Sequence, residues 1–108
     1  MNTPVYDFLI QYAERDPVRL HMPGHKGRFG APALQRATTL DLTEITGADS
    51  LFEAEGILAE SERNAASLYG TAYTFYSCGG STLCIQTMLL LMKQQGRAVL
   101  AARNVHRA

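Results

Sequence analysis

The sequence predicts an α/β fold, in which an N-terminal helix and an irregular segment are followed by a βαβ unit. Residues 71–77 are rich in β-branched and aromatic side chains and have a glycine near each end, as is typical of a strand. Residues 81–95 carry apolar side chains around most of a helical circumference. Residues 97–102 form a second apolar run with little alternation, as in parallel strands that are covered on both faces.

The first expected element is a short amphipathic helix that begins after Thr3. Threonine is a favoured N-cap residue, and Pro4 suits the first turn of a helix. Apolar side chains then recur at helical spacing from Val5 to Ala13, until Asp16-Pro17 ends the pattern.

The next segment, residues 17–56, is predicted to be irregular, because prolines and glycines interrupt any period. It is too apolar and too varied to be a linker. A second helix is expected from Ile57 to Tyr69, with one apolar face and with Gly70 as its C-terminal stop. The chain therefore divides into a loop-rich part, residues 1–56, and the start of an α/β domain, residues 57–108.

Charge and composition exclude several classes of function. Ten basic and ten acidic residues balance, and the basic residues form no run. The sequence therefore shows no basic patch that would bind nucleic acid or an anionic membrane. The N-terminus lacks a signal-peptide pattern, and the apolar run at residues 88–92 is too short to span a bilayer. We expect a cytoplasmic protein with a small-molecule ligand, no nucleic-acid or membrane partner, and free thiols at Cys78 and Cys84.

The loops that follow the two predicted strands should meet at one edge of the sheet, where open α/β sheets bind ligands. Gly79 and Gly80 allow a tight turn, and Ser81 and Thr82 place hydroxyl and N–H groups at the positive end of the next helix. This arrangement suits a phosphate, although an ordinary strand-to-helix turn has the same pattern. His106 follows the second strand, and from pattern alone it is a loop histidine.

A third motif is His21-Met-Pro-Gly-His-Lys-Gly27. On a helix its two histidines would face the same side and suggest a metal site. Pro23 and Gly24 exclude a helix at this point, so no metal site is expected.

The order and spacing of the three motifs resemble the start of the large domain of the Orn/Lys/Arg decarboxylases. These are pyridoxal phosphate (PLP) enzymes of the aspartate aminotransferase fold type, and the resemblance runs from about Thr3 to Arg107, including residues 41–49. It implies an incomplete PLP fold type I large domain that ends after its first βαβ unit. It also implies decarboxylation of ornithine, lysine or arginine in amino-acid and polyamine metabolism, by a homodimer or higher homo-oligomer when full length.

The resemblance also implies roles for the site residues. Ser81 and Thr82 match the serine and threonine that hold the PLP phosphate in the turn with Gly79 and Gly80. Cys78 stands where the family usually has asparagine, which is a stronger hydrogen-bonding side chain.

His106 matches the histidine that stacks on the PLP ring, and it is the catalytic candidate. Val105 and Arg107 depart from the family's motif on either side of it. His25 and Lys26 are candidate substrate-side or interface groups, with a solvated turn as the alternative.

A Schiff-base lysine is not expected in this chain, because neither Lys26 nor Lys93 is at the family's position for it. We therefore expect an N-terminal fragment that is inactive alone. Two alternatives stay open. One is a fragment of another fold type I enzyme, such as an aminotransferase, and the other is a non-catalytic remnant that acts as an interaction module.

Overall fold

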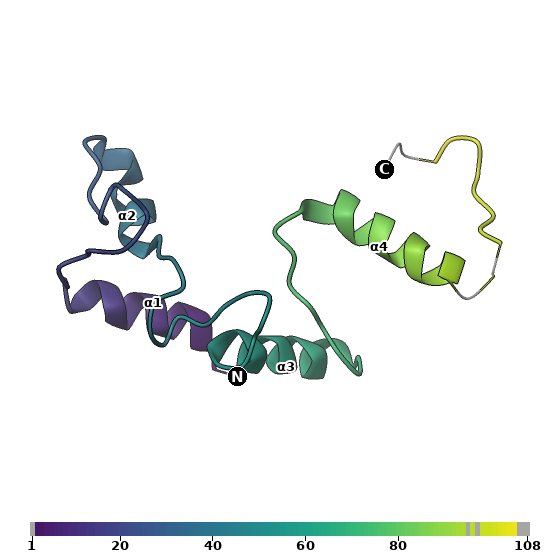
Figure 1. The fold of residues 1–108 in the computed structure, drawn as a ribbon, viewed down its shortest axis with the longest axis horizontal. Helices are drawn as coiled ribbons and strands as arrows, with labels where there is room; N and C mark the ends of the chain where they lie inside the picture. Colours follow the sequence, from purple (N-terminus) through teal and green to yellow (C-terminus); the bar gives the residue numbers. More distant parts are fainter. Residues whose placement is uncertain (1, 95, 97, 106–108) are drawn as a thin grey trace. The chain divides into compact units, whose positions relative to one another are not determined.

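The computed structural model of the chain describes residues 2–94, 96 and 98–105. Within these residues lie four helices, which are α1 (Pro4–Glu14), α2 (Pro32–Leu40), α3 (Ile57–Tyr69) and α4 (Gly80–Gln94) (Figure 1). The chain separates into two compact units, Met1–Thr74 with α1 to α3, and Phe75–Ala108 with α4. The predicted division into residues 1–56 and 57–108 stays a prediction.

The helix predicted near the N-terminus is confirmed as α1. Pro4 occupies its first turn, and the Thr3 backbone N–H and hydroxyl donate to the Asp7 carboxylate over 3.2 and 2.9 Å. An acidic group in the first turn is also favourable for the helix dipole. The side chain of Asn64 on α3 donates to the backbone carbonyl and side-chain oxygens of Asn2, which ties the start of the chain to α3.

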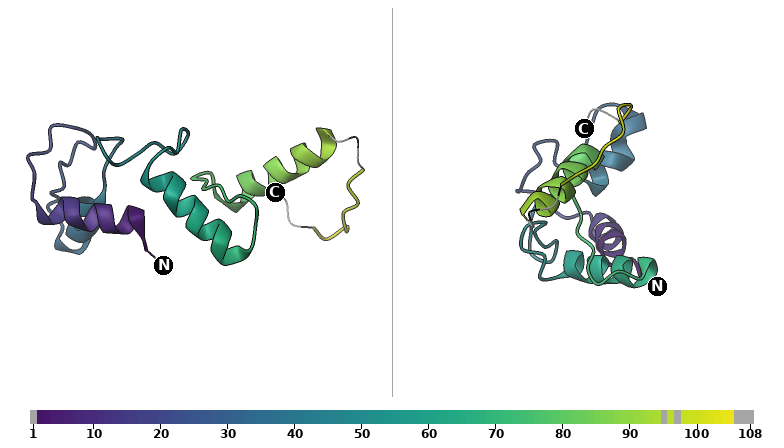
Figure 2. Two further views of the ribbon diagram at one scale, coloured as in Figure 1. Left: turned by 90° about the horizontal axis from the view of Figure 1, so that it is seen from below. Right: turned by 90° about the vertical axis from the view of Figure 1, so that its right-hand side faces the viewer.

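The helix predicted from Ile57 to Tyr69 is confirmed as α3, and its end is set by Gly70. Gly70 adopts a left-handed conformation, with φ 65°, and its N–H donates to the carbonyl of Ala66. α3 packs against α1, which also contacts α2 (Figure 2). Ala66 on α3 is buried, and among the described residues only Gly27 is buried as well, so the core of the unit is small.

The prediction of an irregular segment over residues 17–56 missed α2. Pro32 lies in its first turn, and the hydroxyls of Thr38 and Thr39 both donate to the carbonyl of Gln35, over 2.9 and 2.8 Å. The helix ends at Leu40 and is followed by Asp41, whose backbone is extended. Pro32 is the signal for this helix, because proline is favoured at the start of a helix, but a proline beside a glycine is equally typical of a loop.

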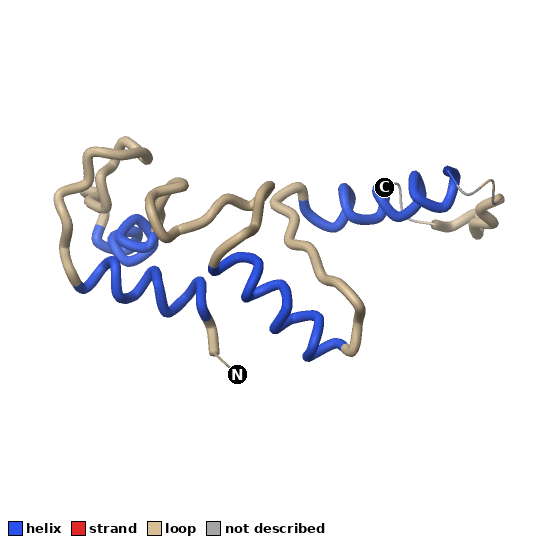
Figure 3. Tube along the Cα trace, turned by 60° about the horizontal axis from the view of Figure 1, so that its bottom comes forward, coloured by secondary structure: helices blue, strands red, loops and turns tan. Residues whose placement is uncertain are grey.

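The predicted α/β fold with a βαβ unit is wrong, because no described residue lies in a strand (Figure 3). Residues 71–77 and the described part of residues 97–102 are loops, and Phe75 and Leu100 are 79% and 100% exposed. The β propensity of a segment reflects how well it fits a half-buried sheet next to other strands. Two parallel strands are too few to form a stable sheet, so these segments stay in loops despite their composition.

The helix predicted over residues 81–95 is present as α4, but its predicted burial is wrong. All of its described side chains are exposed, including the apolar ones from Leu83 to Met92. Within the described residues, no helix is long and apolar enough to cross a membrane. The apolar surface of α4 therefore needs cover that the described residues of the unit Phe75–Ala108 do not provide.

Candidate functional site

The motif at residues 21–27, here called the histidine loop, is fixed to α1 through its first histidine. The Nε2 atom of His21 lies 2.7 Å from the Tyr12 hydroxyl, and its Nδ1 atom contacts the carbonyl of Met22. Because a carbonyl can only accept, the proton of the neutral ring sits on Nδ1, and Nε2 accepts from the tyrosine. Lys26 donates from its ammonium to the carbonyl of His21 over 2.6 Å.

His25 joins the histidine loop to the end of α2. Its Nδ1 atom accepts the backbone N–H of Gly27 over 3.0 Å, so in the neutral ring Nε2 carries the proton and donates to the Asp41 carboxylate over 3.1 Å. The side chain of His25 is 19% exposed. Both ring nitrogens are therefore used inside the protein, and in this arrangement His25 positions the loop. The predicted substrate-side or interface role of His25 and Lys26 stays a prediction.

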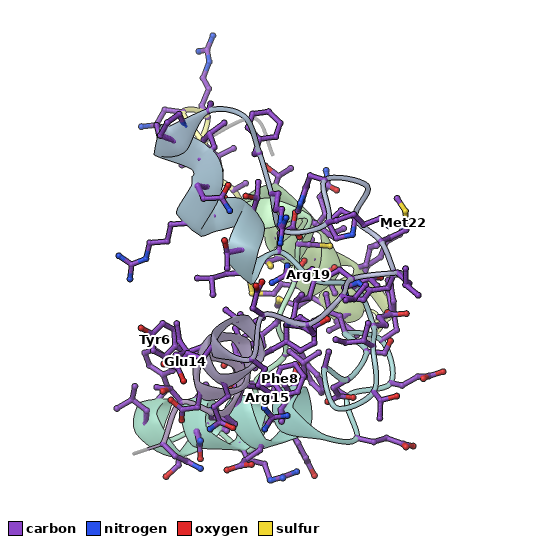
Figure 4. All side chains as sticks on the ribbon, turned by 90° about the vertical axis from the view of Figure 1, so that its left-hand side faces the viewer. Tyr6, Phe8, Glu14, Arg15, Arg19 and Met22 are labelled. Atoms are coloured by element: carbon purple, nitrogen blue, oxygen red, sulfur yellow. The ribbon has the colours of Figure 1, made fainter. Side chains whose placement is uncertain are left out.

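Arg19 connects α1, α2 and the histidine loop (Figure 4). Its guanidinium donates to the carbonyls of Thr38 and Thr39, over 3.4 and 2.6 Å, and these carbonyls lie in the last turn of α2, where intrahelical donors are missing. The Cζ atom of Arg19 also lies 5.2 Å from the centre of the Tyr12 ring, within the range of a cation–π contact. Sequence reasoning did not single out this arginine.

Gly27 packs directly against that guanidinium. Its φ is +76°, and a Cβ atom at this position would lie 2.6 Å from the Cζ atom of Arg19. The side-chain amide of Gln35 donates to the carbonyl of Gly27 over 2.7 Å and accepts the N–H of Phe29 over 3.1 Å. The chain thus folds back onto α2 at a residue whose left-handed backbone favours glycine.

Asp49 organises the loop before α3, and sequence reasoning missed it too. One carboxylate oxygen accepts the backbone N–H groups of Ser50 and Glu55, and the other accepts those of Gly56 and Leu58, all within 3.2 Å. Gly56 and Leu58 supply N–H groups at the N-terminus of α3, where donors lack intrahelical acceptors. An acidic side chain shortly before a helix start was the available signal, but Asp49 lies too far from Ile57 along the chain for an ordinary N-cap.

These contacts give Asp49 a pH-dependent effect on stability. Desolvation acts to raise the pKa of Asp49, but the four backbone N–H groups outweigh it and lower the pKa below its ordinary value of 3.8. Because the folded-state pKa is the lower one, the stabilisation is fully present above pH 3.8 and is lost as the pH falls through the folded-state value.

We predict that Asp49→Asn lowers the stability of the chain at neutral pH and flattens its loss of stability in acid. Thermal unfolding followed by circular dichroism, repeated over a series of acidic pH values, measures both effects. Glu53→Gln is the matched control, because Glu53 is an exposed acid in the same loop. Equal acid dependence in Asp49→Asn and in the original chain would contradict this role.

The second candidate element is the phosphate turn, defined as residues 79–82 in the unit Phe75–Ala108. The structure brings all four predicted residues together at the start of α4, with Gly80 at φ +71° as the first residue of the helix. Gly79 has no room for a side chain, because a Cβ atom would lie 2.3 Å from a methyl group of Leu83. Ser81 and Thr82 are exposed and lie in the first turn, so their N–H groups have no acceptor within the helix.

The remaining predicted residues lie outside the histidine loop and the phosphate turn. His106, the predicted ring-stacking and catalytic residue, lies outside the described residues. Lys93 lies in the last turn of α4, at the opposite end from the phosphate turn. Cys78 and Cys84 are free and exposed.

Comparison with known proteins places the chain in a defined group. A family model described as "Orn/Lys/Arg decarboxylase, major domain" matches residues 3–108. The uncharacterized protein YaaO of Bacillus subtilis (strain 168) is 34% identical and matches 100% of the chain, and the arginine decarboxylase of Bacillus cereus is 32% identical over 98% of it. The lysine decarboxylase LdcA of Pseudomonas aeruginosa is 25% identical over 97% of the chain.

The chain spans only a minor part of these relatives, with 24% of the length of the two Bacillus proteins and 16% of that of LdcA. No solved structure matches the chain.

Proposed function

The chain belongs to the Orn/Lys/Arg decarboxylase family, and on this basis we propose that it is the part of a PLP-dependent decarboxylase of basic amino acids that holds the cofactor's phosphate. Relatives named arginine decarboxylase and lysine decarboxylase support a basic amino acid as the substrate, and they favour decarboxylation over amino transfer. Because the chain spans about a quarter of the Bacillus relatives, the complete activity is proposed for a longer protein that contains it.

The phosphate turn is the observation that carries this proposal. Exposed hydroxyls of Ser81 and Thr82, together with N–H groups at the positive end of α4, form a donor set suited to a phosphate dianion. The left-handed conformation of Gly80 leads the chain into the helix at this point. In this proposal the two hydroxyls donate to phosphate oxygens and thereby fix the position of the cofactor. When bound, PLP supplies an electron-accepting ring for the electrons that departing CO2 leaves behind.

Three further parts of the proposal rest on the family resemblance. In this proposal His106 would stack on the cofactor ring and could assist proton movement at the substrate. His25 and Lys26 lie on the substrate side or at a subunit boundary, and the contacts of the histidine loop with α1 and α2 would keep both in place. The full-length enzyme is a cytoplasmic homodimer or higher homo-oligomer.

We predict that residues 1–108 alone, mixed with PLP, release no CO2 from arginine, lysine or ornithine. The Lys26 ammonium is bound to the carbonyl of His21, and Lys93 lies at the far end of α4 from the phosphate turn, so neither suits covalent attachment of a cofactor held there. The measurement is CO2 release, together with borohydride reduction and mass spectrometry of the chain.

PLP without protein gives the background for this experiment. A PLP adduct on Lys26 or Lys93 that is accompanied by CO2 release would contradict the proposal, because the chain would then contain a complete reaction centre. PLP adducts that form on Lys26 or Lys93 without CO2 release, in the amount expected for any exposed lysine, agree with the proposal.

A further inference from the structure

We infer that a basic pocket beside the histidine loop binds a small oxyanion of the carboxylate or phosphate class. The pocket has a volume of about 310 Å³ and is lined by Asp16, Pro17, Val18, Arg19, Lys26 and Arg28. Three of these side chains are cations and one is an anion, so the lining carries a formal excess of two positive charges. The pocket shares Lys26 with the proposed substrate-side residues, but it involves none of the residues of the phosphate turn, so the inference goes beyond the proposed PLP site.

The positive charge of the pocket is not neutralised within the described part of the chain. Arg19 donates to two backbone carbonyls, and Lys26 uses one of its three N–H donors on the carbonyl of His21. No described residue forms a hydrogen bond or an ion pair with the side chain of Arg28 or of Asp16. The guanidinium of Arg28 therefore offers all its donors, in the fork geometry that suits a carboxylate or a phosphate.

The backbone around Gly27 brings these cations together at the pocket. Lys26 has a left-handed backbone with φ 54°, and the N–H of Arg28 donates to the carbonyl of His25 over 2.8 Å, so the chain turns tightly between the two cationic residues. The contact between Gly27 and Arg19 fixes this turn against the third cation. A site ordered before binding loses less conformational entropy when a ligand arrives, which favours affinity for a small anion.

Titration of the 108-residue chain with inorganic phosphate, acetate or chloride at constant ionic strength tests this inference. The readout is the NMR signal of the Arg28 guanidinium Nε–H group. We expect a saturable shift with phosphate, acetate or both, and none with chloride. Saturation by phosphate alone would assign the site to phosphate ligands, and saturation by acetate alone would assign it to carboxylates.

Substitutions separate this pocket from other anion sites. Arg28→Gln should weaken anion binding by about three- to tenfold, because a solvent-exposed ion contact contributes only a modest binding free energy. In this variant the anion affinity is read from the NMR signal of the Arg19 guanidinium. Arg36→Gln is the matched control, since Arg36 is exposed on α2 and does not line the pocket. The double variant Ser81→Ala/Thr82→Ala should bind the anion in this pocket with unchanged affinity, because neither residue lines it. The result of this test therefore does not depend on whether the PLP proposal is correct.

Two results would overturn the inference. One is a shift of the Arg28 signal that is the same with chloride as with phosphate and acetate, which would show ionic screening only. The other is an unchanged anion affinity in Arg28→Gln while circular dichroism shows its helix content intact.

Discussion

Replacing Ser81 and Thr82 together with alanine should weaken PLP binding by roughly 10²- to 10⁴-fold in a hybrid enzyme. In this hybrid, residues 1–108 replace the matching segment of the Bacillus cereus arginine decarboxylase. Each hydroxyl is proposed to donate to a charged phosphate oxygen, and losing one such hydrogen bond costs about 1.5–3 kcal/mol. The backbone N–H groups at the start of α4 survive both substitutions, so some affinity should remain.

Thr87→Ala is the matched control for this double variant. The hydroxyl of Thr87 donates to the carbonyl of Leu83 within α4, over 2.9 Å, and lies outside the first turn. PLP titrations followed by absorbance should give the original affinity for this control. Equal PLP affinity in the double variant and in the control would remove Ser81 and Thr82 from the proposed phosphate site.

Gly27→Ala should destabilise the unit Met1–Thr74 by about 1–3 kcal/mol, because alanine at a φ of +76° is strained. The added methyl group would also lie 2.6 Å from the Cζ atom of Arg19 and displace the guanidinium. Arg19 would then lose its hydrogen bonds to the carbonyls of α2, so α1, α2 and the histidine loop should loosen together. Urea unfolding followed by far-UV circular dichroism measures the change in the free energy of unfolding.

Gly24→Ala provides a control within the same motif. A Cβ atom at Gly24 meets nothing within 4 Å, and its backbone is not among the left-handed glycines. Its stability should stay close to that of the original chain. If Gly27→Ala and Gly24→Ala unfold at the same urea concentration, the contact between Gly27 and Arg19 is not what stabilises the unit.

The elements predicted correctly from sequence are those whose signals are local. Pro4 and Gly70 set helix ends by their own backbone preferences, and the apolar spacing inside α1, α3 and α4 is visible within a few turns. The strands predicted at residues 71–77 and 97–102 failed because a strand depends on a neighbour that propensity does not supply. The burial of α4 failed for the same reason, since a pattern shows an apolar face but not what covers it.

The phosphate turn and the histidine loop also differ in whether their signals are local in the sequence. The proposed phosphate turn is contiguous in sequence, so its glycines and hydroxyls can be selected from the pattern alone, and its role stays a prediction. The histidine loop was recognised as a motif, but the contacts that hold it come from Arg19, Gln35 and Asp41, which lie outside it. Asp49 was missed because its four N–H partners extend over residues 50–58. Contacts of this kind depend on how the loops fold back, which residue spacing alone does not encode.

Release of CO2 by the hybrid enzyme tests the central claim most directly. If the chain is the phosphate-binding part of a basic amino-acid decarboxylase, the purified hybrid should bind PLP and release CO2 from arginine, lysine or ornithine, and the Ser81→Ala/Thr82→Ala hybrid should do so far more slowly at limiting PLP. A hybrid that folds and binds PLP, yet releases no CO2 from any of the three, would contradict the account.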